Sequence, residues 1–248
     1  MKTSVFASGS SGNCTYIETD ETTILIDAGI SAKRIINELS EAGKDIAEVD
    51  GVFITHEHTD HINGLERLNR LGVPIFMNRK TFDACNLNID ANFFENQEFK
   101  FRDMMLKPIP VNHDAADPVG FLVKNKIKSL GVFTDLGKYD DNLIEIANNV
   151  DALVLETNHD IDMVLNGRYP YHLKQRILGD MGHLSNVDAG LLVKENASEK
   201  LKTVFLAHIS QNNNTYDLAL DTFTKLTNNM KINRILTNQK EMTNIIQL

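Results

Sequence analysis

The sequence predicts an α/β or α+β fold. Short runs of apolar and β-branched residues alternate with segments whose apolar residues recur at helical spacing. The strand-rich stretches fall into two broadly similar halves, which is typical of sheets packed together with helices outside. No Gly/Ser-rich linker, exact repeat or block of charge interrupts the 248 residues, so we expect a single domain over residues 1–248 with a sizeable core.

In the first part of the chain, strands are expected where β-branched and apolar residues cluster. They cover residues 3–7, 14–19, 23–27, 51–55 and 73–77. Helices are expected over residues 31–42 and 64–71. Each of these patterns is followed by a glycine that can end a helix, Gly43 or Gly72.

The middle of the chain predicts two strand pairs that resemble hairpins, over residues 98–111 and 119–134, the second with its turn near Asn125. Helices and strands then alternate to the end of the chain. The predicted helices are 141–148, 187–196 and 216–226, and the predicted strands are 150–156, 203–207 and 234–236.

The composition indicates an acidic, globular, cytoplasmic protein. With 25 Lys+Arg against 34 Asp+Glu, the net charge of −9 argues against a broad electrostatic grip on nucleic acid. The longest apolar runs are far shorter than the roughly 18 to 20 residues of a membrane helix, and the N-terminus lacks the apolar stretch of a signal peptide. Cys14 and Cys85 do not make a disulfide framework, and we expect both to be small core residues.

Three histidines lie within six positions directly after the predicted strand 51–55. The motif is His56-Glu57-His58-Thr59-Asp60-His61. Imidazole and carboxylate are the ligands that zinc, manganese and iron accept, and the end of a strand is a rigid place to hold them. Four ligands exceed the three that a catalytic zinc usually takes, so two metal ions are plausible. A solvated polar loop is the weaker interpretation.

A second metal ion needs ligands from elsewhere in the chain. His113, Asp135 and His208 each follow an apolar strand pattern. For any one of them alone, a capping or hydrogen-bonded loop residue would be the better interpretation. Together with the first motif, they favour metal ligands.

The order His56-x-His58-x-Asp60-His61, His113, Asp135, His208 resembles the metallo-β-lactamase superfamily over nearly the whole chain. The resemblance implies an αββα sandwich with a two-metal site. It further implies that one metal is bound by His56, His58 and His113, the other by Asp60, His61 and His208, with Asp135 bridging them.

Residues 133–135, 141–145, 155–158 and 182–186 resemble the tRNase Z-like phosphodiesterases of this superfamily. In that comparison, Glu156 orients His183 and His183 protonates the leaving oxygen as a general acid. A carboxylate beside an imidazole raises the pKa of the imidazole and fixes its tautomer. The structural alternative for Glu156 is a plain carboxylate at the end of a strand. The structural alternative for His183 is a neighbour of a helix N-cap.

Segments 7–13, 168–171, 173–179, 182–186 and 206–210 are similar to the YycJ (WalJ) family. That similarity implies a cytoplasmic 5′→3′ exonuclease acting on DNA, with two divalent ions of zinc, manganese or iron. We see no long Gly/Pro-rich insertion of the tRNase Z kind and no β-CASP insert, which favours a minimal nuclease or a small-molecule phosphodiesterase.

For a phosphodiester, we expect attack by a hydroxide held between two metals and oriented by Asp60, with His183 as general acid. Arg168, Lys174 and Arg176 form a basic stretch before His183 and are predicted to contact substrate phosphates, although an exposed basic helix face explains them equally well. Asn212 is a further candidate phosphate contact, with an Asn-rich turn as its alternative.

Two other functions stay open, and a third is disfavoured. A small-molecule hydrolase, such as a cyclic-nucleotide phosphodiesterase or a thioesterase, would use the same metals. A tRNase Z-like enzyme would process RNA. A metal-binding scaffold with little catalysis is disfavoured, because the set of predicted ligands is complete.

Overall fold

The computed structural model describes residues 1–248 and divides the chain into two compact units. The N-terminal unit comprises Met1–Pro110, Ala115–Ile127 and Asn238–Leu248, and the C-terminal unit comprises Val111–Asp114 and Lys128–Thr237. The expected single domain over residues 1–248 stays a prediction. None of the helices is long and apolar enough to cross a membrane.

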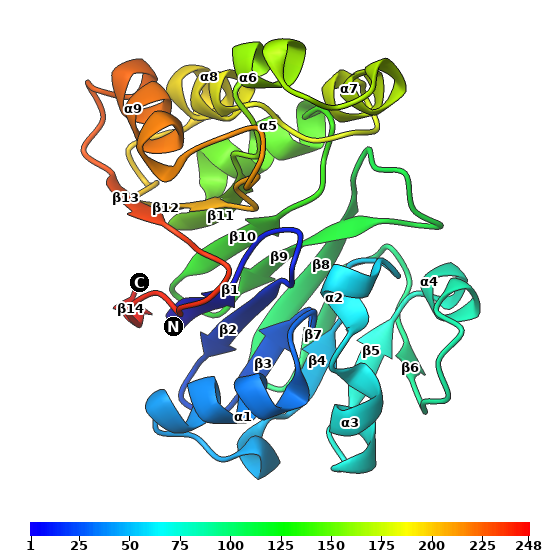
Figure 1. The fold of residues 1–248 in the computed structure, drawn as a ribbon. Helices are drawn as coiled ribbons and strands as arrows, with labels where there is room; N and C mark the ends of the chain where they lie inside the picture. The colour runs from blue at the N-terminus through cyan, green and yellow to red at the C-terminus, as the bar shows by residue number, and fades with distance from the viewer. The chain divides into compact units, whose positions relative to one another are not determined.

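The N-terminal unit contains a mixed sheet of seven strands in the order β14-β1-β2-β3-β4-β5-β6 (Figure 1). The pairs β14-β1, β1-β2 and β2-β3 are antiparallel, whereas β3 to β6 pair in parallel. Their bounds are β1 Lys2–Ala7, β2 Cys14–Glu18, β3 Thr23–Ile26, β4 Gly51–Phe53, β5 Ile75–Met77, β6 Asn92–Phe93 and β14 Ile246–Gln247. The unit also contains the antiparallel strands β7 (Phe99–Phe101), β8 (Met104–Pro110) and β9 (Val119–Lys124).

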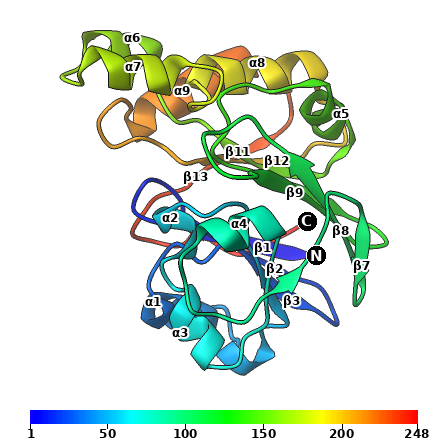
Figure 2. The same cartoon turned by 90° about the vertical axis from the view of Figure 1, so that its right-hand side faces the viewer.

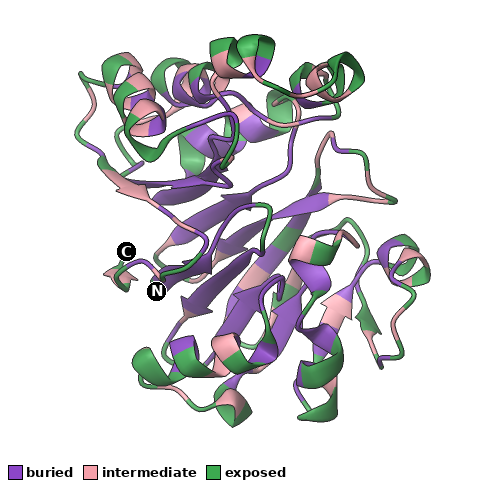
Figure 3. Cartoon of the chain, in the orientation of Figure 1, coloured by how far each residue is buried: buried purple, intermediate pink, exposed green.

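Helices α1 (Ala32–Glu41) and α3 (Leu65–Arg70) cover one face of the mixed sheet (Figures 1 and 2). Their apolar residues, among them Ile35 and Leu68, join a buried cluster with strands β2 to β5. Figure 3 shows this pattern as buried strands next to helices whose other faces are exposed. The remaining helices of the unit are η1 (Ile46–Glu48), α2 (Thr59–Ile62) and α4 (Arg79–Ala84).

In the C-terminal unit, four parallel strands follow the order β10-β11-β12-β13. They are β10 (Ser129–Phe133), β11 (Ala152–Glu156), β12 (Thr203–Ala207) and β13 (Asn233–Leu236). Strands β10, β11 and β12 are buried throughout, as expected for strands whose faces are both covered. The helices are α5 (Asp141–Asn149), α6 (Ile161–Asn166), α7 (Tyr171–Leu178), α8 (Asn186–Asn196) and α9 (Tyr216–Leu226).

Most predicted elements are observed within one or two residues of the expected ends. Strand β12 and helix α9 match exactly, and Gly43 and Gly72 end their helical patterns with positive φ angles of 77° and 82°. The elements that were not predicted are short: η1, α2, α4, α6, α7, β6 and β14. None of them is longer than the eight residues of α7, and a helix of one or two turns shows little of the 3.6-residue period.

Candidate metal centre

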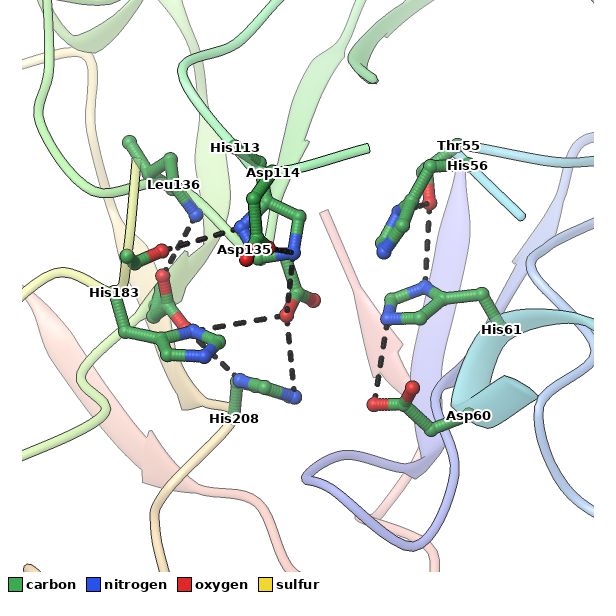
Figure 4. Close-up of polar contacts among 12 residues, drawn as sticks. Thr55, His56, Asp60, His61, His113, Asp114, Asp135, Leu136, His183 and His208 are labelled. Atoms are coloured by element: carbon green, nitrogen blue, oxygen red, sulfur yellow. Dashed lines mark hydrogen bonds and ion pairs between the residues drawn. The ribbon is translucent and has the colours of Figure 1, made fainter. Parts of the chain in front are cut away.

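The histidine motif of the N-terminal unit begins three residues after the end of β4. His56 and His58 lie before α2, while Asp60 and His61 lie on α2, so the expected loop contains a short helix. The ring of His56 lies 4.6 Å from that of His58 and 4.0 Å from that of His61, centroid to centroid. His61 Nε2 lies 3.7 Å from Asp60 Oδ2 (Figure 4). The four side chains therefore cluster within this unit.

Two oxygen-bearing side chains at the ends of β3 and β4 fix the rings of this motif. Asp27 Oδ2 accepts a hydrogen bond from His61 Nδ1 at 2.8 Å, and both groups are buried. Thr55 donates from its hydroxyl and its backbone N–H to Asp27, and its Oγ1 lies 3.0 Å from His56 Nδ1. Because Nδ1 of His56 and of His61 faces a protein oxygen, Nε2 is the nitrogen of these two rings that is left for a metal, and at His61 it also lies 3.1 Å from Asn13 Nδ2.

The backbone of α2 is fixed by the segments that follow β1 and β3. Asn13 N–H donates to the Asp60 carbonyl at 2.8 Å, and Ala28 N–H donates to the His61 carbonyl at 2.9 Å. Gly29 packs so closely that a Cβ there would lie 1.6 Å from the Asp60 carbonyl oxygen. The motif is thus held by main-chain contacts as well as by side chains.

In the C-terminal unit, polar side chains gather at the carboxyl ends of β10, β11 and β12. Asp135 follows β10, Glu156 ends β11 and His208 follows β12. One donor atom from each of these residues, and one from His183, lies within 4.8 Å of the others. Asp135 Oδ1 is 3.5 Å from His208 Nε2 and 3.8 Å from Nε2 of His113 (Figure 4).

Glu156 is fully buried and joins His183 to His208. Its Oε1 accepts from His183 Nδ1 at 2.9 Å and from His208 Nδ1 at 2.8 Å, while its Oε2 accepts two backbone N–H groups, of Leu136 and Leu184. Burial alone would raise the pKa of Glu156, but the charges and hydrogen bonds of the two histidines lower it to about 2. The predicted contact between Glu156 and His183 is therefore present.

His183 lies in the loop before α8 with a side chain that is 19% exposed. Burial lowers its pKa, but the charge of Glu156 and the hydrogen bond to that carboxylate raise the pKa above its usual value. Since Nδ1 donates to Glu156, Nε2 is the nitrogen that can pass a proton to another molecule.

Three strand-end residues adopt left-handed backbone conformations. The φ angles are 63° at Asp27, 56° at Asp135 and 54° at His208. Such angles are uncommon outside glycine and cost about 1–3 kcal/mol each, and they concentrate at functional sites. Here each one belongs to a residue of the histidine and carboxylate clusters.

The four predicted substrate-binding residues lie on or near α6, α7 and the loop after β12. Lys174 Nζ donates to the Leu165 carbonyl at 2.7 Å, and Asn212 Nδ2 donates to the Tyr169 hydroxyl at 2.8 Å. Arg168 is exposed. Their assignment to substrate binding stays a prediction.

Arg176, the fourth, forms a two-point ion pair with Asp114. Its Nε donates to Asp114 Oδ2 at 2.6 Å and its Nη2 to Oδ1 at 3.1 Å. Asp114 directly follows His113, whose Nδ1 lies 3.2 Å from the Gly182 carbonyl oxygen. Arg176 thus ties α7 to the His113 loop.

The sequence patterns do not single out Asp27, Thr55 or Asp114. A signal for Asp27 was present, because it directly follows an apolar strand just as Asp135 and His208 do. The contact between Arg176 and Asp114 spans 62 positions, and no local pattern indicates it.

The donor set fits divalent zinc, manganese or iron. Four histidines have Nδ1 beside a protein oxygen. The partner is a hydroxyl at His56, a carbonyl at His113, and a carboxylate at His61 and His208. Histidines that bind metals are oriented in this way, with the other ring nitrogen left for the ion. No cysteine takes part, which suits borderline and hard ions rather than thiolate-bound ones.

Residues 22–209 match the family model described as the beta-lactamase superfamily domain. The chain belongs to the β-lactamase superfamily. Over 224 residues it is 39% identical to the exodeoxyribonuclease YycJ of Bacillus anthracis, with 87% of this chain and 85% of that protein covered. The predicted superfamily and the resemblance to YycJ are thereby confirmed, as is the prediction of an enzyme of the hydrolase type.

Solved structures of this superfamily share the fold. The metallo-β-lactamase fold protein YhfI from Bacillus subtilis aligns with a TM-score of 0.76 at 15% identity, covering 98% of both chains. The short form of human tRNase Z aligns with a TM-score of 0.68 at 15% identity, covering 100% of both chains. The predicted metallo-β-lactamase fold and its likeness to tRNase Z are confirmed at the level of the fold.

Proposed function

We propose that this protein is a dinuclear metal-dependent exodeoxyribonuclease that degrades DNA from the 5′ end. The observation that carries the proposal is the 39% identity to the exodeoxyribonuclease YycJ over 85% of that protein. The histidine and carboxylate clusters supply the chemistry that such an enzyme needs. We place it in the cytoplasm, a location consistent with its two unbridged, buried cysteines.

The proposed metal ligands are those expected from the family pattern. His56, His58 and His113 would hold one ion, Asp60, His61 and His208 the other, with Asp135 shared. When bound, two divalent ions lower the pKa of water and stabilise the attacking and departing oxygens of a phosphodiester. Zinc, manganese and iron all suit these donors.

The chain's own groups provide the proton transfers. Asp60 accepts a hydrogen bond from the attacking water and so orients it. His183 holds a proton on Nε2 because Glu156 keeps Nδ1 engaged at 2.9 Å and raises the pKa of the ring. Protonation of the leaving oxygen by His183 then lets the phosphodiester break without expelling a free alkoxide.

Arg168, Lys174, Arg176 and Asn212 are proposed to act near the substrate. Exposed Arg168 is the member of this set best suited to a direct phosphate contact, because Lys174 and Asn212 already donate within the protein. Arg176 is paired with Asp114, so its proposed role is to orient the Asp114 carboxylate rather than to contact the substrate itself.

The test compares metal-loaded protein on 5′-labelled single-stranded and duplex DNA, on RNA and on a chromogenic phosphodiester, with manganese, zinc or EDTA. We expect DNA to shorten from its 5′ end and EDTA to stop the reaction. The His183→Gln variant should lose at least about 100-fold in kcat on DNA. His172→Gln changes an exposed histidine on α7 and serves as the matched control.

Two results would overturn the proposal. Hydrolysis of the small diester without degradation of DNA would show a small-molecule hydrolase. Preferential cleavage of RNA would show a tRNase Z-like enzyme.

A further inference from the structure

A cavity of about 520 Å³ lies in the N-terminal unit where the start of α1 meets the junction of α2 and α3. Its polar walls are formed by Ser31, Lys33 and Asn37 from α1 and its cap, and by Asn63 and Arg67 from the segment after α2. None of the residues that line it is acidic or aromatic. The cavity is therefore lined only by cationic, amide, hydroxyl and apolar groups, although the chain carries a net charge of −9.

The two cations of this cavity are available to a ligand. Lys33 and Arg67 are exposed, and neither has a carboxylate within 4.0 Å. Their neighbour Arg34 differs, because it donates to Glu38 at 3.0 Å. The amides of Asn37 and Asn63 are likewise exposed. Four hydrogen-bond donors thus face solvent at one place.

Lys33 also stands in an unfavourable position for the helix itself. It lies in the first turn of α1, a helix of ten residues with no acidic residue in that turn. The start of a helix carries a partial positive charge, so a cation there is unfavourable for the helix. A bound anion would offset both charges.

The cavity is built onto the histidine motif. Asn63 lies two residues after His61, and its N–H donates to the Thr59 carbonyl at 3.0 Å. Gly64 N–H donates to the Ala28 carbonyl at 2.8 Å, and a Cβ at Gly64 would lie 2.6 Å from the Ile30 carbonyl oxygen. The segment that enters α1 is therefore packed directly on the segment that leaves the motif (Figure 1).

We propose that this cavity binds backbone phosphates of the DNA strand whose end is processed at the histidine motif. The inference rests on the proposed function and names a substrate subsite of the same protein. Two cations on separate helices, Lys33 on α1 and Arg67 on α3, supply positive charge for the phosphates of one strand. Without an aromatic or acidic side chain, the site offers neither base stacking nor a reader of base edges, so binding there is independent of sequence.

The test is a binding measurement with the metal-loaded protein. A fluorescent single-stranded oligonucleotide with nuclease-resistant phosphorothioate linkages is titrated by anisotropy between 0.05 and about 0.5 M salt, a range in which each phosphate contact is strongly salt-dependent. Lys33→Gln combined with Arg67→Gln is compared with Lys107→Gln combined with Lys126→Gln. The control pair is exposed, lies in the same unit and removes the same charge.

Each phosphate contact on a single strand contributes about 0.7 to the slope of log K against log salt, so losing two lowers the slope by about 1.4. If the two contacts contribute nothing near 1 M salt, a slope lower by about 1.4 over one decade of salt means that the affinity of the double variant at 0.1 M is about 25-fold below that of the wild type. The control pair should retain the wild-type slope. Melting temperatures of both double variants check that the fold is kept.

Equal slopes for the two double variants would overturn the subsite, as would a wild-type protein that does not bind the oligonucleotide. Binding of inorganic phosphate alone at the cavity, with no effect on DNA, would also overturn it. The proposed function fails separately, through the cleavage assay, because the binding measurement does not depend on turnover.

Discussion

Asp27→Asn is the substitution that most directly tests the carboxylate that orients His61. Asp27 Oδ2 accepts from His61 Nδ1 at 2.8 Å, and Oδ1 accepts from the N–H of Thr55 at 2.8 Å. Asparagine keeps the shape but removes the charge and one acceptor. The variant therefore leaves His61 with a weaker orienting contact while the backbone is unchanged.

The magnitude follows from the character of that hydrogen bond. The side chains of His61 and Asp27 are 0% and 3% exposed, so solvent screens the contact little. A hydrogen bond to a charged group contributes about 1.5–3 kcal/mol, which corresponds to roughly 10- to 150-fold in an equilibrium constant. Loss of such an orienting partner typically costs 10- to 100-fold in metal affinity. We expect a loss of about 10- to 100-fold for one of the two ions.

The assay is competition with a chromogenic chelator, which reports the affinity of each bound ion. Asp50→Asn is the matched control, because Asp50 also accepts a backbone N–H in this unit, that of Thr23 at 2.8 Å, but contacts no histidine. Metal affinity unchanged in Asp27→Asn, with a melting temperature like that of the control, would refute the orienting role.

Three further outcomes test other contacts. Glu156→Gln removes the carboxylate that raises the pKa of the general acid, so kcat on DNA should fall about 100-fold or more, with the optimum of the pH–rate profile displaced to lower pH. Gly29→Ala forces a methyl against the Asp60 carbonyl, and differential scanning fluorimetry should show a melting temperature lower by roughly 2–10 °C; an unchanged temperature would contradict the packing. Burial raises the pKa of Asp151, but hydrogen bonds from Lys128 and Ser129 outweigh that effect and lower the pKa. The ionised Asp151 therefore stabilises the fold at pH values above the unfolded pKa near 4, and this stabilisation is lost as the pH falls through the folded pKa. Urea midpoints of wild type and Asp151→Asn should differ at pH 7 and converge towards pH 3.

The regular elements were predictable because their residues repeat over enough positions. Residues 203–207 are five consecutive residues with a strand pattern, and the observed β12 has the same ends. Residues 59–62 make only one turn, and the helix α2 there is held by contacts from Asn13 and Ala28. Those contacts come from residues more than 30 positions away in the sequence, so no local sequence pattern predicts this helix.

The candidate site was predictable wherever a polar residue follows an apolar strand. Asp135, His208 and the motif at His56 were found by that rule. The rule also applies to Asp27, whose role emerges only when its partner His61 is known. For Arg176, the sequence shows the charge of the side chain but not its ion pair with Asp114, which lies 62 positions away.

Part of the acidity of the chain does not face a polyanionic substrate, because several of its acidic groups are buried. Asp27, Asp135 and Glu156 are buried beside histidines, where their charge is directed at imidazole rings rather than at solvent. Lys33 and Arg67, in contrast, are exposed cations without an acidic partner. Long-range attraction to DNA is therefore expected to be weak, and removing the two cations should lower the salt dependence of binding measurably.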